Sequence, residues 1–324
     1  MRILVTGAAG FVGPFLCRRL VEEGYAVRAA VRRHEDLACL PRECEPAVVT
    51  DLNLSEARRR LVTGVDGVVH LAAKVHDISY RSADDLEAYV AANTAITADL
   101  ARAAAAAGAG VFVFASSIKV NGESTAPGRP FTAADIPDPQ GAYAISKWRA
   151  EQALQELARE TGIRAVAVRP PLVYGPRVKG NFLRLMRLVR LGLPLPLGSA
   201  TNRRSLLYVG NLADLLVRCL RPVDASVVVA SDGAPVSTRQ LVIELAEAMD
   251  SHTRLLPFPV SLLRVAAWIA GRAEEVERLL GSLEIDSSDS ELRLAWQPPF
   301  TRRRALEETA AWCLAGHAQS KKAA

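Results

Sequence analysis

Residues 2–13 read Arg2-Ile-Leu-Val-Thr-Gly7-Ala-Ala-Gly10-Phe-Val-Gly13, an apolar run followed by three spaced glycines. The run predicts a buried strand, and apolar residues at helical spacing begin at Phe11. Glycines at a strand–helix junction permit a tight turn and a close approach of the backbone to a pyrophosphate, which then faces the amino end of the helix. The stretch therefore predicts a dinucleotide-binding loop, with contacts from Gly7, Gly10, Phe11, Val12 and Gly13.

The first half of the chain continues to alternate short apolar runs with amphipathic stretches. Expected strands follow at 26–31, 47–49, 65–70, 111–115 and 165–168, with helices at 11–22, 84–107 and 143–161. This order predicts a Rossmann-type α/β fold, a doubly wound parallel sheet with helices on both faces. From residue 178 onward, Pro, Gly and Arg interrupt the apolar runs. We expect a dinucleotide-binding domain over 1–177, its sheet completed near 226–230, a smaller, mainly helical substrate lobe over 178–318, and a frayed tail at 319–324.

Composition narrows the class of protein. Half of the 324 residues are hydrophobic and 23% are charged, which suits a large core and excludes a disordered chain or a disulfide-stapled miniprotein. Forty Lys and Arg against thirty-five Asp and Glu give a net charge of +5, which we attribute mostly to arginine bias and not to nucleic-acid binding. Five scattered cysteines and five dispersed histidines predict reduced, buried thiols and no metal site.

The amino terminus shows no signal peptide, so we expect a cytoplasmic protein. The apolar stretch 255–271 contains Pro257, Pro259 and Arg264 and is too short to span a bilayer. We expect it to form a packed helix, and we expect no membrane span in this chain.

The end of the second expected strand separates NAD from NADP. An NAD site usually places Asp or Glu there to hold the ribose 2′-hydroxyl. Here the chain reads Ala-Val-Arg32-Arg33, and a guanidinium is a good partner for a 2′-phosphate. Arg32 and Arg33 therefore favour NADP(H), with NAD(H) as the open alternative. Asp51 follows the third strand and is either an acceptor for the adenine amino group or a cap for a helix from Leu54 onward.

The segment Tyr143-Ala-Ile-Ser-Lys147 carries the expected chemistry. Residues four apart share one face of a helix, so the Lys147 ammonium is expected to favour the Tyr143 phenolate and to lower the pKa of that phenol. Tyr143 is then suited to move a proton on and off a carbinol oxygen. Ser116 and Ser117 end the fifth expected strand, at the sheet edge where ligands bind, and one of them is expected to donate to the substrate oxygen.

Together these motifs resemble the extended short-chain dehydrogenases/reductases, and within them the NAD(P)-dependent nucleotide-sugar epimerases and dehydratases, over nearly the whole chain. The resemblance is carried by residues 6–13, Asp51-Leu52, 70–73, Asn93, Ser116-Ser117, Tyr143 to Lys147 and Arg169-Pro-Pro-Leu-Val-Tyr-Gly-Pro176. It implies catalytic Ser117, Tyr143 and Lys147, with Asn93 supporting a proton relay; Ser117 is chosen because the family's catalytic serine is the last of its run. The cofactor contacts that it implies are Asp51, Leu52, Leu71, Ala72, Ala73, Tyr143, Lys147 and Pro170.

The second lobe resembles the diphosphate clamp of the same family. The resemblance implies that Asn181 contacts the diphosphate or base, that Arg204 contacts the β-phosphate, and that Leu197 lies in the matching segment. Many relatives carry a second phosphate-binding Arg where this chain has Leu292, four residues before Trp296; Arg293 is the weaker candidate. His76 and Lys119 either line the sugar pocket or are a loop histidine and a surface lysine. The implied partners are a UDP-sugar and, through helices near 84–107 and 143–161, a second copy of the chain.

Two reactions remain open. Dehydratases of the family place Asp-Glu after the catalytic hydroxyl, where this chain has Ile118-Lys119, and the epimerase–reductases need a Cys/His pair that is missing near the serine. Of the reactions of this family, hydride transfer at C4 of the sugar therefore remains. We expect NADPH-dependent reduction of a UDP-4-keto-6-deoxy-N-acetylhexosamine to UDP-N-acetyl-quinovosamine or a similar sugar, because residues 72–77, 116–122 and 202–211 resemble such reductases. The alternative is a 4-epimerase of UDP-glucose or UDP-N-acetylglucosamine with tightly bound NAD.

Two further classes share part of this pattern. A reductase of a non-nucleotide carbonyl would share the arginine pair, although the Asn181 and Arg204 segments argue against it. A redox-sensing NADP-binding regulator would share the glycine loop but would not require Tyr143 and Lys147.

Overall fold

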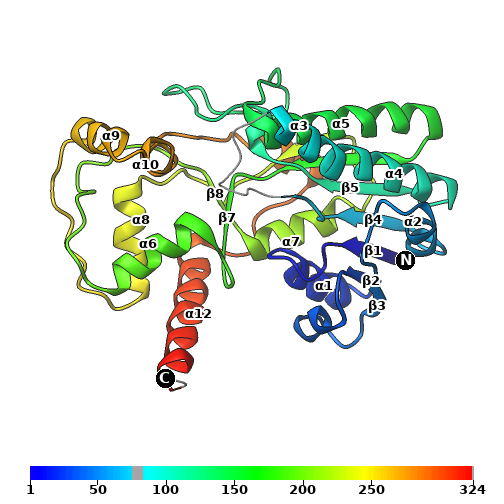
Figure 1. The fold of residues 1–324 in the computed structure, drawn as a ribbon, viewed down its shortest axis with the longest axis horizontal. Coiled ribbons are helices and arrows are strands. Elements are labelled where there is room, and N and C mark those ends of the chain that lie inside the picture. The colour runs from blue at the N-terminus through cyan, green and yellow to red at the C-terminus, as the bar shows by residue number, and fades with distance from the viewer. Residues whose placement is uncertain (75–82, 323–324) are drawn as a thin grey trace.

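The computed structural model describes residues 1–74 and 83–322, and its centre is a seven-stranded parallel sheet (Figure 1). The strand order is β3-β2-β1-β4-β5-β6-β9, the Rossmann order with one strand added beyond β6. The strands are β1 (Arg2–Thr6), β2 (Ala26–Val31), β3 (Glu45–Val48), β4 (Gly67–His70), β5 (Val111–Ala115), β6 (Arg164–Arg169) and β9 (Val227–Val229). The predicted fold class is confirmed.

Helices cover both faces of the sheet because its strands are apolar on both sides. One face carries α1 (Gly13–Glu22) and α7 (Val209–Arg218); the other carries α2 (Ser55–Val62), α4 (Ile96–Ala106) and α5 (Gly141–Thr161). The single helix expected over 84–107 is instead α3 (Ala83–Tyr89) and α4, joined by a π-helical turn (Val90–Ala95). Short 3-10 helices lie at His34–Cys39 and Ile118–Val120.

The C-terminal part contains a second apolar cluster, in which the Tyr174 ring stacks on Phe182 and lies tilted against Tyr208. Two short parallel strands run through it, β7 (Leu172–Tyr174) and β8 (Leu206–Tyr208). The helices here are α6 (Gly180–Arg190), α8 (Thr238–Ala248), α9 (Val260–Ile269), α10 (Ala273–Leu280), α11 (Ser288–Leu294) and α12 (Arg302–Lys322). Sequence analysis did not predict the small sheet, because three-residue strands carry no readable alternation.

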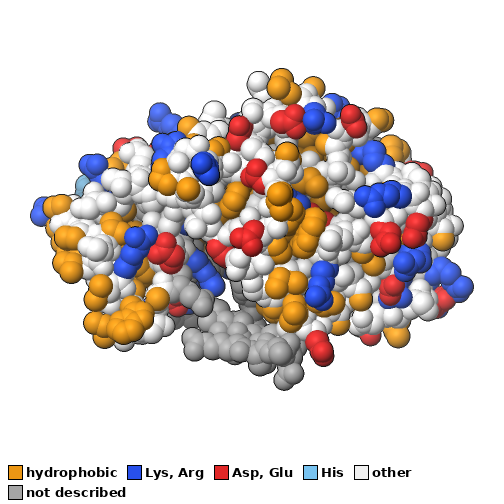
Figure 2. Space-filling view, turned by 90° about the horizontal axis from the view of Figure 1, so that it is seen from above, with side chains coloured by type: hydrophobic (Ala, Val, Ile, Leu, Met, Phe, Trp, Pro, Cys, Tyr) orange, Lys and Arg blue, Asp and Glu red, His pale blue; other side chains and the backbone are white. Residues whose placement is uncertain are grey.

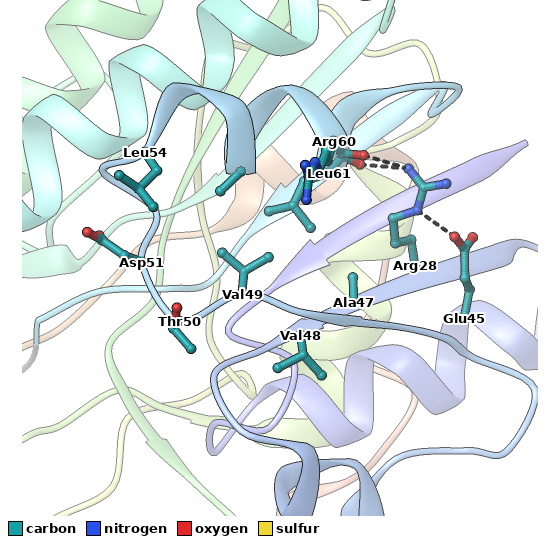
Figure 3. A pocket seen from close by; sticks show the side chains of 11 residues that line it. Arg28, Glu45, Ala47, Val48, Val49, Thr50, Asp51, Leu54, Arg60 and Leu61 are labelled. Carbon is teal, nitrogen blue, oxygen red and sulfur yellow. Dashed lines mark hydrogen bonds and ion pairs between the residues drawn. The ribbon is translucent and has the colours of Figure 1, made fainter.

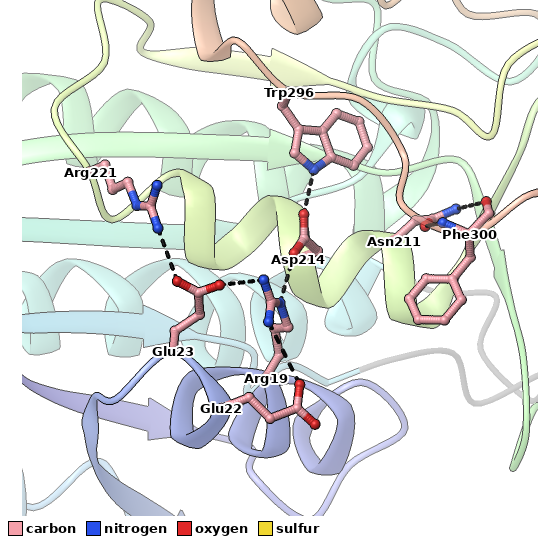
Figure 4. A network of polar contacts seen from close by, with 8 residues as sticks. All are labelled: Arg19, Glu22, Glu23, Asn211, Asp214, Arg221, Trp296 and Phe300. Carbon is pink, nitrogen blue, oxygen red and sulfur yellow. Dashed lines mark hydrogen bonds and ion pairs between the residues drawn. The ribbon is translucent and has the colours of Figure 1, made fainter.

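A polar network fixes α1 to the C-terminal part (Figure 4). Asp214 on α7 accepts from Arg19 Nε of α1 at 2.7 Å and from Trp296 Nε1 at 2.8 Å. One turn earlier on α7, the Asn211 side chain exchanges two 2.9 Å hydrogen bonds with the backbone of Phe300. The helix that follows the glycine loop is therefore tied to α7 and to the segment that precedes α12.

Two expectations are corrected here. The stretch 255–271 does form a helix, α9, but only Ala267 of that helix is buried, so the packed helix that we expected lies at the surface. Cys17, Cys219 and Cys313 are buried, whereas Cys39 and Cys44 are only partly so. In the part of the chain that the structure describes, no helix is both long and apolar enough to cross a membrane.

Candidate active site

The glycine loop between β1 and α1 leaves no room for side chains at two positions. Gly7 has a φ of +68°, and a Cβ there would lie 2.8 Å from the backbone nitrogen of Ala72, just past β4. A Cβ on Gly13 would lie 2.1 Å from the carbonyl oxygen of Ala8. Val12, the residue that precedes α1, makes no side-chain hydrogen bond to the first turn of the helix. The backbone N–H groups of that turn can therefore bind another acceptor. These residues fit the pyrophosphate of a dinucleotide.

The other predicted cofactor contacts follow the carboxyl ends of neighbouring strands. Parallel strands end at one edge of a sheet, which is where ligands of open α/β folds bind. At or just beyond these ends lie Gly10, Phe11, Leu52, Leu71, Ala73 and Pro170.

Arg33 is already paired within the chain. Its Nη2 donates to Asp36 Oδ1 at 2.9 Å, and its backbone nitrogen donates to Asp36 Oδ2 at 3.3 Å. This bond raises the pKa of the Arg33 guanidinium and lowers the pKa of the Asp36 carboxyl. Arg32 is exposed. A carboxylate therefore lies beside the two arginines that we expected to select a 2′-phosphate.

A cavity of ≈ 320 Å³ lies between β3 and α2 (Figure 3). At one end the Arg28 guanidinium donates to Glu45 at 2.9 Å and to carbonyl oxygens at the carboxyl end of α2. At the other end Asp51 accepts from the backbone and side-chain nitrogens of Asn53, both at 2.8 Å. Asp51 does not cap α2, whose N-cap residue is Leu54.

Ser117, Tyr143 and Lys147 meet at the carboxyl end of β5. The Ser117 hydroxyl is hydrogen-bonded to the Tyr143 phenol and accepts from the backbone nitrogen of Lys119 at 3.3 Å. Lys147 is 2% exposed, and its Nζ donates to the carbonyl oxygen of Ala115 at 2.8 Å. The structure thus brings the three predicted reacting side chains together.

Burial dominates the ionisation of two of these groups. It raises the pKa of Tyr143 to about 12, against the opposing effect of the hydrogen bond from Ser117. Burial also lowers the pKa of Lys147 to about 7, and the Glu151 carboxylate partly opposes this. The lowered Tyr143 pKa that we expected is therefore wrong. Lys147 Nζ lies 5.9 Å from the Tyr143 ring centroid and is directed to a backbone carbonyl.

Asn93 is buried in the π-helical turn and connects the end of β4 to α5. Its Oδ1 accepts from the backbone nitrogen of Lys74 at 2.7 Å, and its Nδ2 donates to the Lys74 carbonyl at 3.1 Å and to Ser146 Oγ at 3.0 Å. Ser146 Oγ in turn donates to the carbonyl of Tyr143 at 2.8 Å. Asn93 therefore holds the backbone next to Tyr143.

Sequence analysis missed a buried ion pair on α5 and β6. Arg169 and Glu151 are 2% and 1% exposed, and Nε and Nη2 of Arg169 donate to the carboxylate at 2.6 to 3.2 Å. Arg169 Nη1 also donates to Asn121 Oδ1 at 2.9 Å. The available signal was spacing, since Glu151 follows Lys147 by one helical turn.

This pair also separates the two serines. The Ser116 hydroxyl donates to the Glu151 carboxylate and is buried. Ser117 is the serine that contacts Tyr143.

Arg204 lies just before β8. Its Nη1 donates to the carbonyl of Gly281 at 2.9 Å, and burial lowers the pKa of its guanidinium while Glu277 and Glu123 oppose this. Both carboxylate oxygens of Glu123 also accept from Lys119 Nζ at 2.7 Å. The Glu123 carboxylate therefore interacts electrostatically with both Lys119 and Arg204.

Three other predicted substrate residues are placed differently. Leu197 is buried in the second apolar cluster. Asn181 is exposed at the start of α6, where its Oδ1 accepts from Arg184 at 3.4 Å. His76 lies outside the described residues.

Arg293 lies on α11 with two partners of its own. Its Nε donates to Asp289 at 2.8 Å, and its Nη1 donates to the carbonyl of Asp224 at 3.1 Å. Leu292, at the position of the missing second arginine, is 80% exposed. The contacts of Arg293 are thus with α11 and the segment before β9.

Comparisons with known proteins agree with this geometry. Residues 3–230 match the model of the NAD dependent epimerase/dehydratase family. The chain is 41% identical to a UDP-glucose 4-epimerase of Vibrio cholerae, covering 95% of this chain and 94% of that one. It is 34% identical to a 2-alkyl-3-oxoalkanoate reductase of Stenotrophomonas maltophilia over 77% and 76% of the two chains. The crystal structure of UDP-glucose 4-epimerase from Thermotoga maritima with UDP-glucose superposes with a TM-score of 0.78 at 21% identity, over 98% of this chain and 100% of that one.

Proposed function

The chain belongs to the NAD-dependent epimerase/dehydratase family of extended short-chain dehydrogenases/reductases acting on nucleotide sugars, and we propose that it is a UDP-hexose 4-epimerase. The observation that carries the proposal is the 41% identity to a UDP-glucose 4-epimerase over nearly the full length of both chains. This favours the epimerase over the NADPH-dependent 4-ketoreductase that the arginine pair had favoured. The substrate class is UDP-glucose or UDP-N-acetylglucosamine.

The pairing of Arg33 supports NAD over NADP as the resident cofactor. The Asp36 carboxylate offsets part of the charge of the Arg33 guanidinium and would repel a 2′-phosphate placed beside it. The loop from Gly7 to Gly13 would hold the pyrophosphate, and Lys147 the nicotinamide ribose. Bound NAD supplies a hydride acceptor that later returns the hydride.

In this proposal Tyr143 moves the proton at the substrate's 4-hydroxyl, and Ser117 donates a hydrogen bond to the same oxygen. Loss of the C4 hydride and of the O4 proton leaves a 4-ketone. After the ketone has rotated in the site, return of the hydride to the opposite face of C4 and of the proton to O4 would give the epimer. Burial raises the pKa of Tyr143, and Lys147 is directed to the Ala115 carbonyl. The proposal therefore requires Lys147, one helical turn from Tyr143, to act as the cation that favours the phenolate.

Arg204 and Lys119 support a diphosphate position between the lobes. Both cations lie near Glu123, and a diphosphate would replace part of that interaction with a stronger one. We further propose the domain boundary near residue 177 and a homodimer formed through the helices of 84–107 and 143–161.

The test starts with purified protein and no added nucleotide. We expect NAD, and not NADP, to be released on denaturation, and UDP-glucose and UDP-galactose to interconvert without external cofactor. If neither this pair nor the N-acetyl pair interconverts, and NADPH is instead oxidised by UDP-4-keto-6-deoxy-N-acetylglucosamine, the chain is the reductase.

A further inference from the structure

Helix α9 exposes a large apolar face. Leu262 and Val265 are 53% and 54% exposed, and Trp268 and Ile269 are each 74% exposed. At 100° per residue these four side chains fall within an arc of about 120° on the helix. The preceding segment extends the surface with Leu256 and Phe258, which are also exposed. Figure 2 shows hydrophobic side chains gathered at the left end of the molecule, where Figure 1 places α9.

The opposite face of the same helix is apolar as well. Val260 and Leu263 pack against the second apolar cluster, and Ala267 is buried. Apart from Ser261 and Arg264, the side chains of α9 are apolar on both faces. A helix with apolar side chains on both faces is normally covered on both, by protein or by lipid. Here the chain covers one side of α9 and leaves the other uncovered.

Within residues 254–272 every charged side chain is an arginine: Arg254, Arg264 and Arg272. The neighbouring helix α10 carries carboxylates, and one of them, Glu277, binds Arg264 at 3.0 Å. Arg254 and Arg272 are the exposed arginines that border the apolar face. An apolar face bordered by arginines complements a surface in which anionic groups lie above an apolar layer.

We propose that α9 and residues 254–258, here called the α9 face, dock on the surface of a membrane that contains anionic lipids. The apolar side chains enter the boundary between headgroups and acyl chains, with Trp268 at the depth that aromatic rings prefer. Arg254 and Arg272, which are both exposed, lie among the lipid phosphates. With ten residues, α9 lies on the bilayer and does not cross it.

Charge argues against a second copy of the chain as the occupant. Two α9 faces packed together would bring Arg254 and Arg272 of one copy near those of the other, with no carboxylate within residues 254–272 to pair with them, whereas Arg264 is already paired with Glu277. Like charges at an interface are unfavourable, whereas anionic headgroups neutralise them.

Sedimentation with lipid vesicles tests the proposal without any substrate, so its outcome is independent of the proposed function. The full chain is mixed with vesicles of phosphatidylglycerol and phosphatidylethanolamine, and separately with vesicles of phosphatidylcholine. We expect binding to the anionic vesicles that weakens with salt, and a blue shift of tryptophan fluorescence that disappears in W268F while binding remains.

The double variant W268Q/I269Q should lose tenfold or more in vesicle partitioning, since two large apolar side chains no longer leave water. R254Q/R272Q should lose about fivefold per arginine on anionic vesicles only. Leu292→Gln on α11 is the matched control, because Leu292 is equally exposed but lies outside the α9 face. It should bind as the parent chain does.

Three results would overturn the proposal. The first is a parent chain that sediments with neither kind of vesicle. The second is a W268Q/I269Q variant that sediments with vesicles like the parent chain. The third is a parent chain that forms a larger species in sedimentation velocity without vesicles, which W268Q/I269Q converts to a smaller one; a second copy is then the occupant.

Discussion

Helices α5 and α9 depart from the usual distribution of side chains in opposite directions. Polar and charged residues are mostly exposed in proteins, and large apolar ones are mostly buried. α5 buries Lys147 and Glu151, whereas α9 leaves Trp268 and Ile269 in solvent. Both helices pack on an apolar cluster with their other side.

The two helices differ in whether other parts of the chain offset the unfavourable placement of these side chains. On α5 the buried charges have partners within the chain: Ala115 for Lys147, and Arg169 with Ser116 for Glu151. Their desolvation is thus offset in part by groups within the chain. The apolar side chains of the α9 face are exposed to solvent in the described part of the chain, and exposed apolar patches of this kind often mark a contact with another molecule.

The largest expected effect is on the rate of 4-epimerisation, when the phenol oxygen of Tyr143 on α5 is removed. Tyr143→Phe should lower 4-epimerisation about 10²- to 10⁴-fold, because the proton at O4 loses its acceptor and donor. Fold and bound NAD should be retained, since the ring stays in place. The measurement is the initial rate of UDP-glucose conversion, with Tyr25→Phe as the control. A Tyr143→Phe rate equal to that of the control would refute the role of the phenol.

The next largest effect is on stability, when the buried ion pair between Glu151 and Arg169 is broken. Glu151→Gln leaves Arg169 buried without a countercharge and should lower the free energy of unfolding by about 3–5 kcal/mol. Urea denaturation measures it. Glu307→Gln is the control, because the ion pair of Glu307 with Arg303 is solvent-exposed and contributes less than about 1 kcal/mol.

The double variant E151L/R169M sharpens this result. If the loss comes from the unpaired charge, removing both charges should recover most of it. A double variant as unstable as Glu151→Gln would mean that shape, and not charge, is what the pair contributes.

A smaller effect appears only in acid. Burial, with a further contribution from the charge of Lys147, lowers the pKa of His70 to about 3 from an ordinary value of 6.5. Between these values the unfolded chain binds a proton that the folded chain does not, so stability falls as the pH drops below about 6.5. The loss at pH 5 is about 2 kcal/mol.

His70→Asn should remove this loss while keeping a polar atom near Thr6 Oγ1, which the His70 Nδ1 contacts at 2.6 Å. The measurement compares unfolding free energies at pH 7.5 and 5. The exposed His252, replaced by Asn, should leave the difference unchanged. Equal acid sensitivity in His70→Asn and the parent chain would place the effect elsewhere.

Much of the first lobe could be predicted because its signals are local. Short apolar runs alternating with amphipathic stretches marked the six strands from β1 to β6, and a spacing of four placed Tyr143 and Lys147 on one helix face. What could not be predicted depends on three-dimensional partners. The pairing of Arg33 with Asp36 requires the 3-10 helix after β2, and the turn of Lys147 toward Ala115 requires knowing which acceptor β5 presents.

The same limit explains α9. Periodicity showed an apolar helix, and an apolar helix is most often packed. Whether both faces of the helix are buried depends on which other segments pack against them in the folded chain. The spacing of apolar residues in 255–271 does not show this.

The smallest expected effect is a matched pair of substitutions on the two faces of α9. Trp268→Gln should change the free energy of unfolding by no more than about 0.5 kcal/mol, because the ring is already in water in the folded chain. Leu263→Ala, on the face that packs against the second cluster, should cost about 1 kcal/mol or more. Both are measured by urea denaturation without lipid. If Trp268→Gln destabilises the chain as much as Leu263→Ala, the α9 face is covered within the folded protein, and the contrast with α5 no longer holds. A neutral Trp268→Gln that also loses vesicle binding would mean that this side chain is kept for a contact outside the chain.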